Sequence, residues 1–559
     1  MKWPFIGGAY SGRSLNANAS TCFNWFIEPA SKGQDAMLVP TPGYTLLSTS
    51  TGGTALPIRG MLYPGSGNFQ YCVQGDRFAI YNLSTGIWTV NAFPLSTSSG
   101  PVSMEINDTD GVNGFVVFCD GVAAYSYNIA SAAIVNLTSL YGFVSNTVCF
   151  LDGRFIVDDQ VNPGRFYYSG IYDGLFTNQF NFATQEGSPD YLRAVLTDRR
   201  ELWLFGDLTT EVWWSTSDAN LPFQRSQGGF IHMGIAAPYT AKRFDNSVIW
   251  LGRNERGELQ VVRAGDGMAA EVVSPPELNF SMAGLVPCDA YAMVYQLGGH
   301  EFYVLTFPTS NRTYVLDSLT KEWHVWRSGA TAKHLAQCIA SARISGANTI
   351  LMGLIASDRS IYRLSDTAYT DNGTAIQRQR TSSHGHDERE RIRLANFQLD
   401  VEAGPSSTVK LSTTVAVTSF PAGDFTVSTA SSAGIVAGDA IAIALASGRL
   451  HTSTVTGTTA GPTISFNTAL PETASLGAAV TVYASEVINL SWSKDGGNTF
   501  GTAVAVHIGT PLTKRFRAIV RKLGNARNWT FRVETNATVK VAILGAYAKT
   551  FGDDRDEPG

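Results

Sequence analysis

The chain has 559 residues, a formal net charge of −5, 44% apolar residues, 11% aromatic residues and only 16% charged residues. The small acidic charge excludes a global basic field that would draw the protein to nucleic acid or to an anionic membrane, and no apolar run approaches the roughly 18 residues that span a bilayer. The apolar content, together with 54 glycines and 22 prolines, favours a large all-β protein with much buried surface.

The first 57 residues precede the repeating part of the chain, and we expect them to form an N-terminal arm that is part of a platform. Their start, MKWPFIGGAYSGRS, lacks a basic region followed by an apolar one, so we expect no secretory signal. The pair Pro42-Gly43 predicts a turn that closes a short hairpin before the repeats begin.

Strand-like segments with an aromatic or apolar anchor recur through residues 58–375. The anchors are Tyr81, Tyr127, Tyr167, Val212, Val261, Tyr314 and Tyr362. By subtraction, successive anchors lie 46, 40, 45, 49, 53 and 48 residues apart. Periods of roughly 40 to 50 residues made of short strands are typical of propeller blades, because one four-stranded blade cannot bury both of its faces alone. The sequence therefore predicts a β-propeller of about six blades, with a large irregular sandwich as the alternative.

Residues 376–404 differ in character, and we predict that they add strands to the platform. This segment interleaves five arginines with three acids: Arg378, Arg380, Arg389, Arg391 and Arg393, against Asp387, Glu388 and Glu390. The interleaving favours ion pairs at a subunit interface, and contact with the phosphates of DNA is the alternative.

Within this segment, His384, His386 and Asp387 form the densest potential metal cluster of the chain. Two imidazoles that lie two residues apart on an extended strand point the same way and could share a metal. We favour the alternative, a polar loop or subunit contact with solvent-facing histidines, and predict no resident metal and no cofactor.

Residues 405–485 are rich in Ser, Thr, Ala, Val and Gly and contain few charges. This composition predicts a small inserted β domain. Turns at strand tips tolerate inserted domains best, so we expect this domain to interrupt a hairpin at an exposed edge. The strand pattern resumes near residue 486, and residues 486–559 are predicted to complete the platform.

The sharpest local motif is an Asp-box, S-x-D-x-G-x-T-F, formed by Ser493, Asp495, Gly497, Thr499 and Phe500. In such a turn the carboxylate accepts backbone N–H bonds, the glycine permits positive φ, and the aromatic ring anchors the hairpin. Sialidases and other propeller enzymes carry several such boxes, whereas this chain shows one convincing copy. We therefore predict a structural turn.

A basic stretch follows the Asp-box and contains Arg515, Arg517, Arg521, Lys522 and Arg527. These side chains are candidates for a sequence-independent contact with the phosphates of passing DNA. They are equally candidates for ion pairs with acids of a neighbouring subunit.

No enzyme motif is present: the chain lacks GxxxxGK[ST], HExxH and GxSxG, so NTPase, zincin and serine-hydrolase chemistry have no support. No pair of carboxylates is singled out for glycoside hydrolysis either. We predict that the protein is not an enzyme and has no catalytic residue.

The six cysteines are scattered, without a CxxC pair or a histidine at ligand spacing: Cys22, Cys72, Cys119, Cys149, Cys288 and Cys338. In a chain of this length they are typical of isolated, mostly buried thiols. We therefore expect assembly in a reducing cytoplasm.

Three segments of the chain carry a family resemblance. The N-terminal segment is GRSLNANASTCFNWFIEP followed by PTPGYTLL. The central one runs from Leu221-Pro222-Phe223 through Gly234 and Asp245-Asn246 to Trp250-Leu251-Gly252 and Gly257. The distal one contains Trp492, Asp495-Gly496-Gly497, Leu523-Gly524, Arg527 and Phe531-Arg532-Val533. Together these segments resemble the packaged-DNA stabilisation proteins that form the tail hub or nozzle of short-tailed phages. Residues 405–485 depart from the pattern of that family.

This resemblance implies a non-enzymatic virion component with a β-propeller on a platform, six copies of which form a ring beneath the portal and its adaptor. The ring is expected to close the portal channel, retain packaged double-stranded DNA, conduct it during ejection and dock tail fibres or spikes. A host surface receptor is a further candidate partner. The expected location is the virion tail, after assembly in the host cytoplasm.

The rival function is that of a tail-borne propeller glycosidase, or of a carbohydrate-binding propeller, that recognises host surface glycans. Either could act as a monomer, whereas a nozzle requires a closed ring. Oligomeric state therefore separates the two hypotheses.

Overall fold

The structure is a computed structural model that describes residues 1–8, 19–30, 35–52, 56–65, 67–107, 114–178, 180–185, 187–188, 190–216, 218, 222–254, 256–265, 269–329, 331–355, 358–385, 391–404, 409–416, 418–459, 462–484, 486–508 and 515–550. The chain forms two compact units. One unit combines Met1–Gly43 with Thr367–Gly559, and the other is Tyr44–Asp366.

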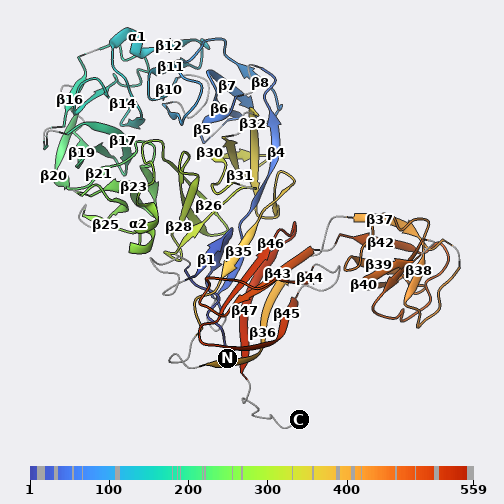
Figure 1. Ribbon diagram of the computed structural model, residues 1–559. Helices are drawn as coiled ribbons and strands as arrows, with labels where there is room; N and C mark the ends of the chain where they lie inside the picture. The colour runs from blue at the N-terminus through green and yellow to red at the C-terminus, as the bar shows by residue number, and fades with distance from the viewer. Residues whose placement is uncertain are drawn as a thin grey trace. The chain divides into compact units, whose positions relative to one another are not determined.

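The unit Tyr44–Asp366 is a β-propeller. Its blades are small β-sheets that follow one another around a ring (Figure 1). Blade one contains β5 (Ile58–Leu62), β6 (Phe69–Gln74), β7 (Arg77–Asn82) and β8 (Trp88–Val90). Blade two contains β9 (Ser103–Ile106), β10 (Phe115–Cys119), β11 (Ala124–Asn128) and β12 (Ile134–Asn136). Blade three contains β13 (Val148–Leu151), β14 (Arg154–Asp158), β15 (Arg165–Tyr168) and β16 (Phe182–Thr184).

Blades four to seven continue the ring. Blade four contains β17 (Leu192–Asp198), β18 (Glu201–Gly206), β19 (Thr210–Ser215) and β20 (Phe223–Ile231), and blade five contains β21 (Gly234–Ile235), β23 (Ser247–Arg253), β24 (Leu259–Ala264) and β25 (Ala270–Val272), with β22 (Lys242–Phe244) paired to β23. Blade six contains β26 (Tyr291–Leu297), β27 (His300–Phe307), β28 (Arg312–Asp317) and β29 (Trp323–Val325). Blade seven contains β30 (Ala336–Ile344), β31 (Ala347–Leu354), β32 (Ser360–Ser365) and β4 (Gly43–Thr49).

Two short helices lie between blades: α1 (Leu137–Tyr141) and α2 (Pro276–Met282). Neither they nor any other helix within the described ranges is long and apolar enough to cross a membrane.

The all-β propeller predicted from the sequence is confirmed, but the described residues form seven blades rather than about six. Each of the seven anchor residues lies on the third strand of a different blade, from Tyr81 on β7 to Tyr362 on β32. The spacing thus had the correct period, and the six intervals between anchors correspond to seven units.

The seventh blade takes its outer strand from the N-terminal part of the chain. The Thr49 Oγ1 and Ser360 Oγ atoms are 2.8 Å apart, the Ser50 N–H donates to the Arg359 carbonyl at 3.1 Å, and the ring of Tyr44 packs edge-on against that of Tyr362. The propeller unit therefore begins at Tyr44, earlier than the expected boundary at residue 58, because a strand far upstream closes the ring.

Neighbouring blades are held together by buried aromatic rings. Phe78 on β7 stacks on Phe118 on β10 with 5.2 Å between ring centroids, and Phe166 on β15 meets Trp213 on β19 edge-on at 5.5 Å. Such pairs add about 0.5–1.5 kcal/mol each beyond their area burial. These contacts explain why the aromatic segments recur once per blade.

The other unit contains a β-sandwich built from both ends of the chain. One sheet has the order β2 (Trp25–Glu28), β3 (Met37–Pro40), β47 (Val541–Thr550), β36 (Ile392–Ala403) and β45 (Arg515–Ala526). The other has the order β1 (Thr21–Phe23), β35 (Arg378–Thr381), β46 (Thr530–Thr535), β43 (Glu486–Ser493) and β44 (Val504–Ile508). A two-stranded hairpin, β33 (Thr370–Asp371) and β34 (Thr374–Ala375), also belongs to this part of the chain.

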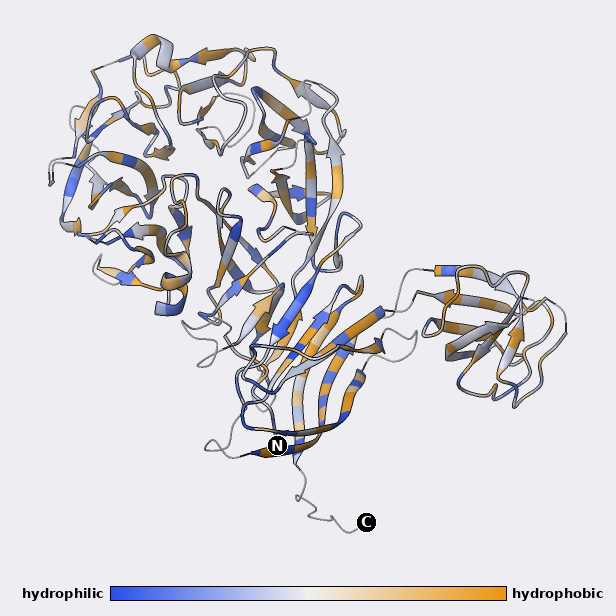
Figure 2. Cartoon of the chain, viewed as in Figure 1, coloured by the Kyte–Doolittle hydropathy of each residue, from blue (hydrophilic) through white to orange (hydrophobic). Residues whose placement is uncertain are grey.

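Hydrophilic and hydrophobic bands alternate along the long strands of the sandwich (Figure 2). The inward residues of both sheets join one buried core, in which the rings of Phe397 and Phe531 stack with 3.8 Å between centroids. Period-two alternation is what a strand with one buried face requires.

Residues 409–484 form a separate β module within the same unit. Its strand order is β37 (Val409–Thr414), β42 (Ala479–Tyr483), β39 (Ala440–Ala444), β40 (Leu450–Thr459), β41 (Thr463–Phe466) and β38 (Thr426–Ser428). The module has its own hydrophobic core, which includes Ile441, Ile464 and Val480. It begins and ends between β36 and β43, two strands of the sandwich.

Candidate nucleic-acid or subunit interface

The basic residues Arg515, Arg517 and Arg521 lie on β45, the edge strand of its sheet. They share one face of the strand because side chains alternate with period two, while Ala518 and Val520 point into the sandwich core. All three arginines are exposed. The fold therefore places a row of guanidinium groups on the outer face of an edge strand.

The row is extended by a bulge. Arg521 pairs with Asn396 and Gly524 pairs with Leu394, so β45 holds an additional residue at this point. Lys522 occupies the bulge with a positive φ of 61° and is exposed, as is Arg527 in the turn that precedes β46. A bulge of this kind bends the strand and re-aims its side chains.

One of these five cations is neutralised within the chain. The Arg515 Nη2 atom lies 3.1 Å from the Asp400 Oδ2 atom, and Asp400 also accepts a hydrogen bond from Gln398. Within the described ranges, no ion pair engages any of the other four cations. A local excess of positive charge on an acidic chain suits an anionic partner, whether phosphate groups or an acidic protein surface.

The earlier arginine run does not form a second exposed row, and its interpretation as an interface is wrong for its first two members. Arg378 is fully buried and donates to the Thr41 carbonyl at 3.3 Å and the Ala537 carbonyl at 3.2 Å. Burial lowers the pKa of Arg378 to about 10. Arg380 is also buried and donates to the Phe5 carbonyl at 2.8 Å. Both guanidinium groups satisfy backbone carbonyls inside the unit.

Arg391 and Arg393, from the same run, are exposed on the sandwich. The remaining arginine, Arg389, and the candidate metal ligands His386 and Asp387 lie outside the described residues. Within the described part of the chain, no group of three or more His, Cys, Asp or Glu side chains is placed to hold a metal.

The Asp-box is a closed turn at the end of β43. The Asp495 carboxylate accepts hydrogen bonds from the Thr499 N–H at 3.0 Å and the Thr499 hydroxyl at 2.5 Å, and the Ser493 hydroxyl donates to it as well. These donors hold the pKa of Asp495 at about 2. The guanidinium of Arg532 lies 3.5 Å from the centroid of the Phe500 ring. The side chains of Ser493, Asp495 and Thr499 thus bond to one another and to the backbone of the turn.

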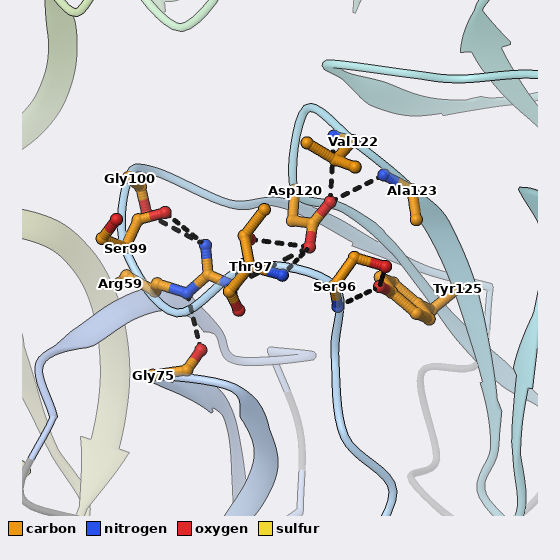
Figure 3. A network of polar contacts seen from close by, with 10 residues as sticks. All are labelled: Arg59, Gly75, Ser96, Thr97, Ser99, Gly100, Asp120, Val122, Ala123 and Tyr125. Atoms are coloured by element: carbon orange, nitrogen blue, oxygen red, sulfur yellow. Dashed lines mark hydrogen bonds and ion pairs between the residues drawn. The ribbon is translucent and has the colours of Figure 1, made fainter.

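A buried polar network between the first two blades was not foreseen from the sequence (Figure 3). Arg59, on β5, is fully buried. Its guanidinium donates to the carbonyls of Gly75 at 2.7 Å, Ser99 at 2.9 Å and Thr97 at 2.7 Å. A single side chain thus ties the segment that enters the second blade to a turn of the first.

Asp120, which follows β10, completes this network. One carboxylate oxygen accepts from the N–H groups of Val122 at 3.0 Å and Ala123 at 2.7 Å, and the other accepts from the Thr97 N–H and hydroxyl. That second oxygen lies 3.9 Å from the Arg59 Nη2 atom, and both side chains are fully shielded from solvent. The pair therefore belongs to the architecture of the ring.

The third blade also contains a buried aspartate that accepts backbone N–H groups. Asp158, at the end of β14, is buried and accepts from the N–H groups of Asn146 at 3.0 Å and Thr147 at 2.7 Å. Burial raises the pKa of Asp158 to about 6. The signal in the sequence is an aspartate that ends an apolar second strand, as in FVVFCD and RFIVDD.

Two family models match the chain. The model described as bacteriophage P22 Gp10, beta-propeller, matches residues 1–366, which is more than half of the 559 residues. The model described as bacteriophage P22 Gp10, beta-sandwich, matches residues 468–550. Most of the inserted module lies between the two matches.

No curated protein matches the chain significantly. Among solved structures, the N-terminal domain of Nup159 is 13% identical with a TM-score of 0.37, over 58% of this chain and 95% of that chain. A S. cerevisiae complex of Dbp5 with Nup159 and Gle1 gives 10% identity and a TM-score of 0.37, over 59% of this chain and 95% of that chain. At these scores neither likeness bears on function.

Proposed function

The chain belongs to the phage stabilisation family represented by bacteriophage P22 Gp10, and from this premise we propose that it is the hub, or nozzle, of a phage tail. The family is one of structural phage tail proteins that stabilise packaged DNA. In the proposed role the protein closes the portal channel after packaging, retains the DNA, conducts it during ejection and docks tail fibres or spikes.

The proposed assembly is a ring of six copies attached to a tail adaptor. A heterologous interface that closes on itself generates a ring, and a ring is what a conduit requires. All six cysteines are free thiols, which suits assembly in the reducing cytoplasm of the host. Gating is mechanical: inward loops narrow the lumen, and contact with a host receptor shifts them.

The observation that supports a DNA contact is the exposed row of cations on and after β45. Four of the five cations have no ion-pair partner among the described residues, and each is free to neutralise a phosphate without reading a base. Outward-facing cations on an edge strand also prevent that strand from pairing with foreign strands. Contact with an acidic surface of the next subunit is the second use that this geometry supports.

The first test is the mass and symmetry of the purified protein, measured by native mass spectrometry with negative-stain class averages, alone and with adaptor and portal. The proposal expects a hexameric ring with a central hole. A persistent monomer at high concentration, with both partners present, would overturn the nozzle and make glycan binding or cleavage the next assay.

The second test separates the two uses of the cationic row. The double variant Arg517→Gln with Arg521→Gln is compared with Arg449→Gln, a control at a highly exposed arginine of the inserted module. If the row contacts DNA, the slope of log affinity against log salt falls by about 0.9 for each phosphate contact removed, and ring assembly is unchanged. If the row binds a subunit, ring assembly weakens instead. A double variant that behaves like the control in both assays would contradict both uses.

A further inference from the structure

The centre of the propeller holds a cavity of about 330 Å³ lined by the innermost strands of all seven blades and the residues that lead into them. Tyr239 is one of the lining residues. It precedes β22 and bridges to Tyr291 at the start of β26, and a Cβ atom added to Gly121 in the second blade would lie 3.1 Å from its hydroxyl. Because every blade contributes to the lining, the cavity lies where the seven blades meet.

The charged groups in this lining are three basic side chains and one acid: Arg59, Lys242, Arg243 and Glu105. Arg59 is committed to the network with Asp120. Two nitrogens of Arg243, Nε and Nη2, donate to Thr197. For the Nη1 atom of Arg243 and the ammonium of Lys242, the described residues provide no hydrogen-bond partner. Two basic groups thus have donors without a protein acceptor; burial lowers the pKa of Lys242, and the charge of Glu105 opposes that shift.

A buried amide also belongs to this lining. Gln337 lines the same cavity, is 6% exposed, and its Oε1 atom has no hydrogen-bond partner among the described residues. Buried polar atoms in folded proteins are nearly always paired. The NH₂ group of the same amide is not among the shielded atoms without a partner, and it is the donor that Gln337 can present to an anion.

The acid of the pocket is Glu105, on β9. The charged groups that act on it are the cations Lys242 and Arg243, which favour its ionised form, and the Cys149 thiol lies near it. Burial raises the pKa of Glu105 by more than the two cations lower it, and the resulting pKa is about 7. Near neutral pH this side chain is therefore present both as a carboxylate and as a carboxylic acid that can donate a hydrogen bond.

We propose that the propeller cavity binds a small free oxyanion of the size of sulfate or phosphate, held by Lys242 and Arg243. A cationic ligand would meet two cations against one acid, whereas an oxyanion satisfies both uncommitted basic groups. Glu105 takes up a proton when the anion enters, because the protonated acid donates to an anion that its carboxylate would repel. This site is distinct from the cationic row on β45 and does not depend on the nozzle function.

The test is calorimetric titration with sodium sulfate, whose charge is constant near neutrality, at fixed ionic strength maintained with chloride. If Glu105 must be protonated, sulfate binds about tenfold more tightly at about pH 6 than at about pH 8. Glu105→Gln removes this pH dependence. Lys242→Met weakens binding by about tenfold or more, the effect expected for a hydrogen bond to a charged group, while Lys549→Met, at an exposed lysine of the sandwich, leaves binding unchanged.

Three outcomes would overturn the proposal: no saturable sulfate binding to the wild-type chain at the acidic pH, equal affinity at both pH values, or equal effects of Lys242→Met and Lys549→Met. The pH dependence of the wild-type chain needs no variant, so a substitution that prevents folding leaves the proposal falsifiable. Circular dichroism melts identify such a variant before titration.

Discussion

Replacement of Asp120 by asparagine is expected to destabilise the propeller by about 3–5 kcal/mol, because it leaves a buried guanidinium without its acid. Arg59 and Asp120 are both fully shielded, and the Asp120 Oδ2 atom lies 3.9 Å from the Arg59 Nη2 atom. The asparagine oxygen can still accept from Val122 and Ala123. Its NH₂ group, however, would face the N–H and hydroxyl of Thr97, which both donate to the carboxylate.

The two costs differ in origin. An unmatched buried N–H at Thr97 costs about 1–3 kcal/mol, and the uncompensated charge of Arg59 supplies the rest. Arg59 keeps its carbonyl partners, which limits the second cost. Adding Arg59→Met to Asp120→Asn should therefore cost less than the sum of the two single variants, since the charge that lacks its partner is gone.

Urea unfolding, followed by circular dichroism and tryptophan fluorescence, measures the shift in the midpoint of the propeller transition. The matched control is Asp76→Asn in the first blade. Asp76 Oδ1 lies 3.7 Å from Arg77 Nε, and both side chains are about a third exposed, so its loss should cost under about 1 kcal/mol. If Asp120→Asn is as mild as Asp76→Asn, the buried pair does not hold the two blades together and the reasoning is refuted.

Three further predictions concern both units. Gly385→Ala places a Cβ atom 1.9 Å from the indole of Trp3 and should destabilise the sandwich by about 1–3 kcal/mol in the same urea assay. The control Gly457→Ala, whose Cβ has no atom within 4 Å, should leave stability unchanged. Equal effects of the two variants would contradict the packing argument. The pKa of Asp495 is held at about 2 by the donors of its turn, below its unfolded value of about 4, so the stability it contributes is present above about pH 4 and lost as the pH falls towards 2. The destabilisation by Asp495→Asn in thermal melts should shrink over that interval, and a difference that does not change with pH would show that the turn does not depend on the charge. Cys288 is exposed while four other cysteines are buried, so native alkylation followed by mass spectrometry should label Cys288 first; rapid labelling of the buried thiols would contradict the packing of the two units.

The periodicity of the anchor residues was sufficient to predict the propeller, because each blade must bury one aromatic or apolar face against the next and so repeats its pattern. The number of blades was harder to obtain from the chain alone. The closing strand of the seventh blade, β4, lies more than 300 residues upstream of its partner β32, and no local spacing reports such a pairing. The Asp-box could be recognised from sequence because the hydrogen bonds of its Ser493 and Asp495 side chains join residues at most four positions apart.

The sequence by itself determined the all-β class and the propeller repeat, since both follow from local pattern and composition, and the same kind of signal predicted the Asp-box turn and the inserted module. Only the tertiary structure decided which arginines are available to a partner. Arg378 and Arg517 both sit on strands with polar neighbours, yet Arg378 is buried under the carbonyls of distant segments and Arg517 is exposed on an edge strand. The exposure of a strand residue depends on which strands pack over it, and those strands come from parts of the chain that local sequence does not connect.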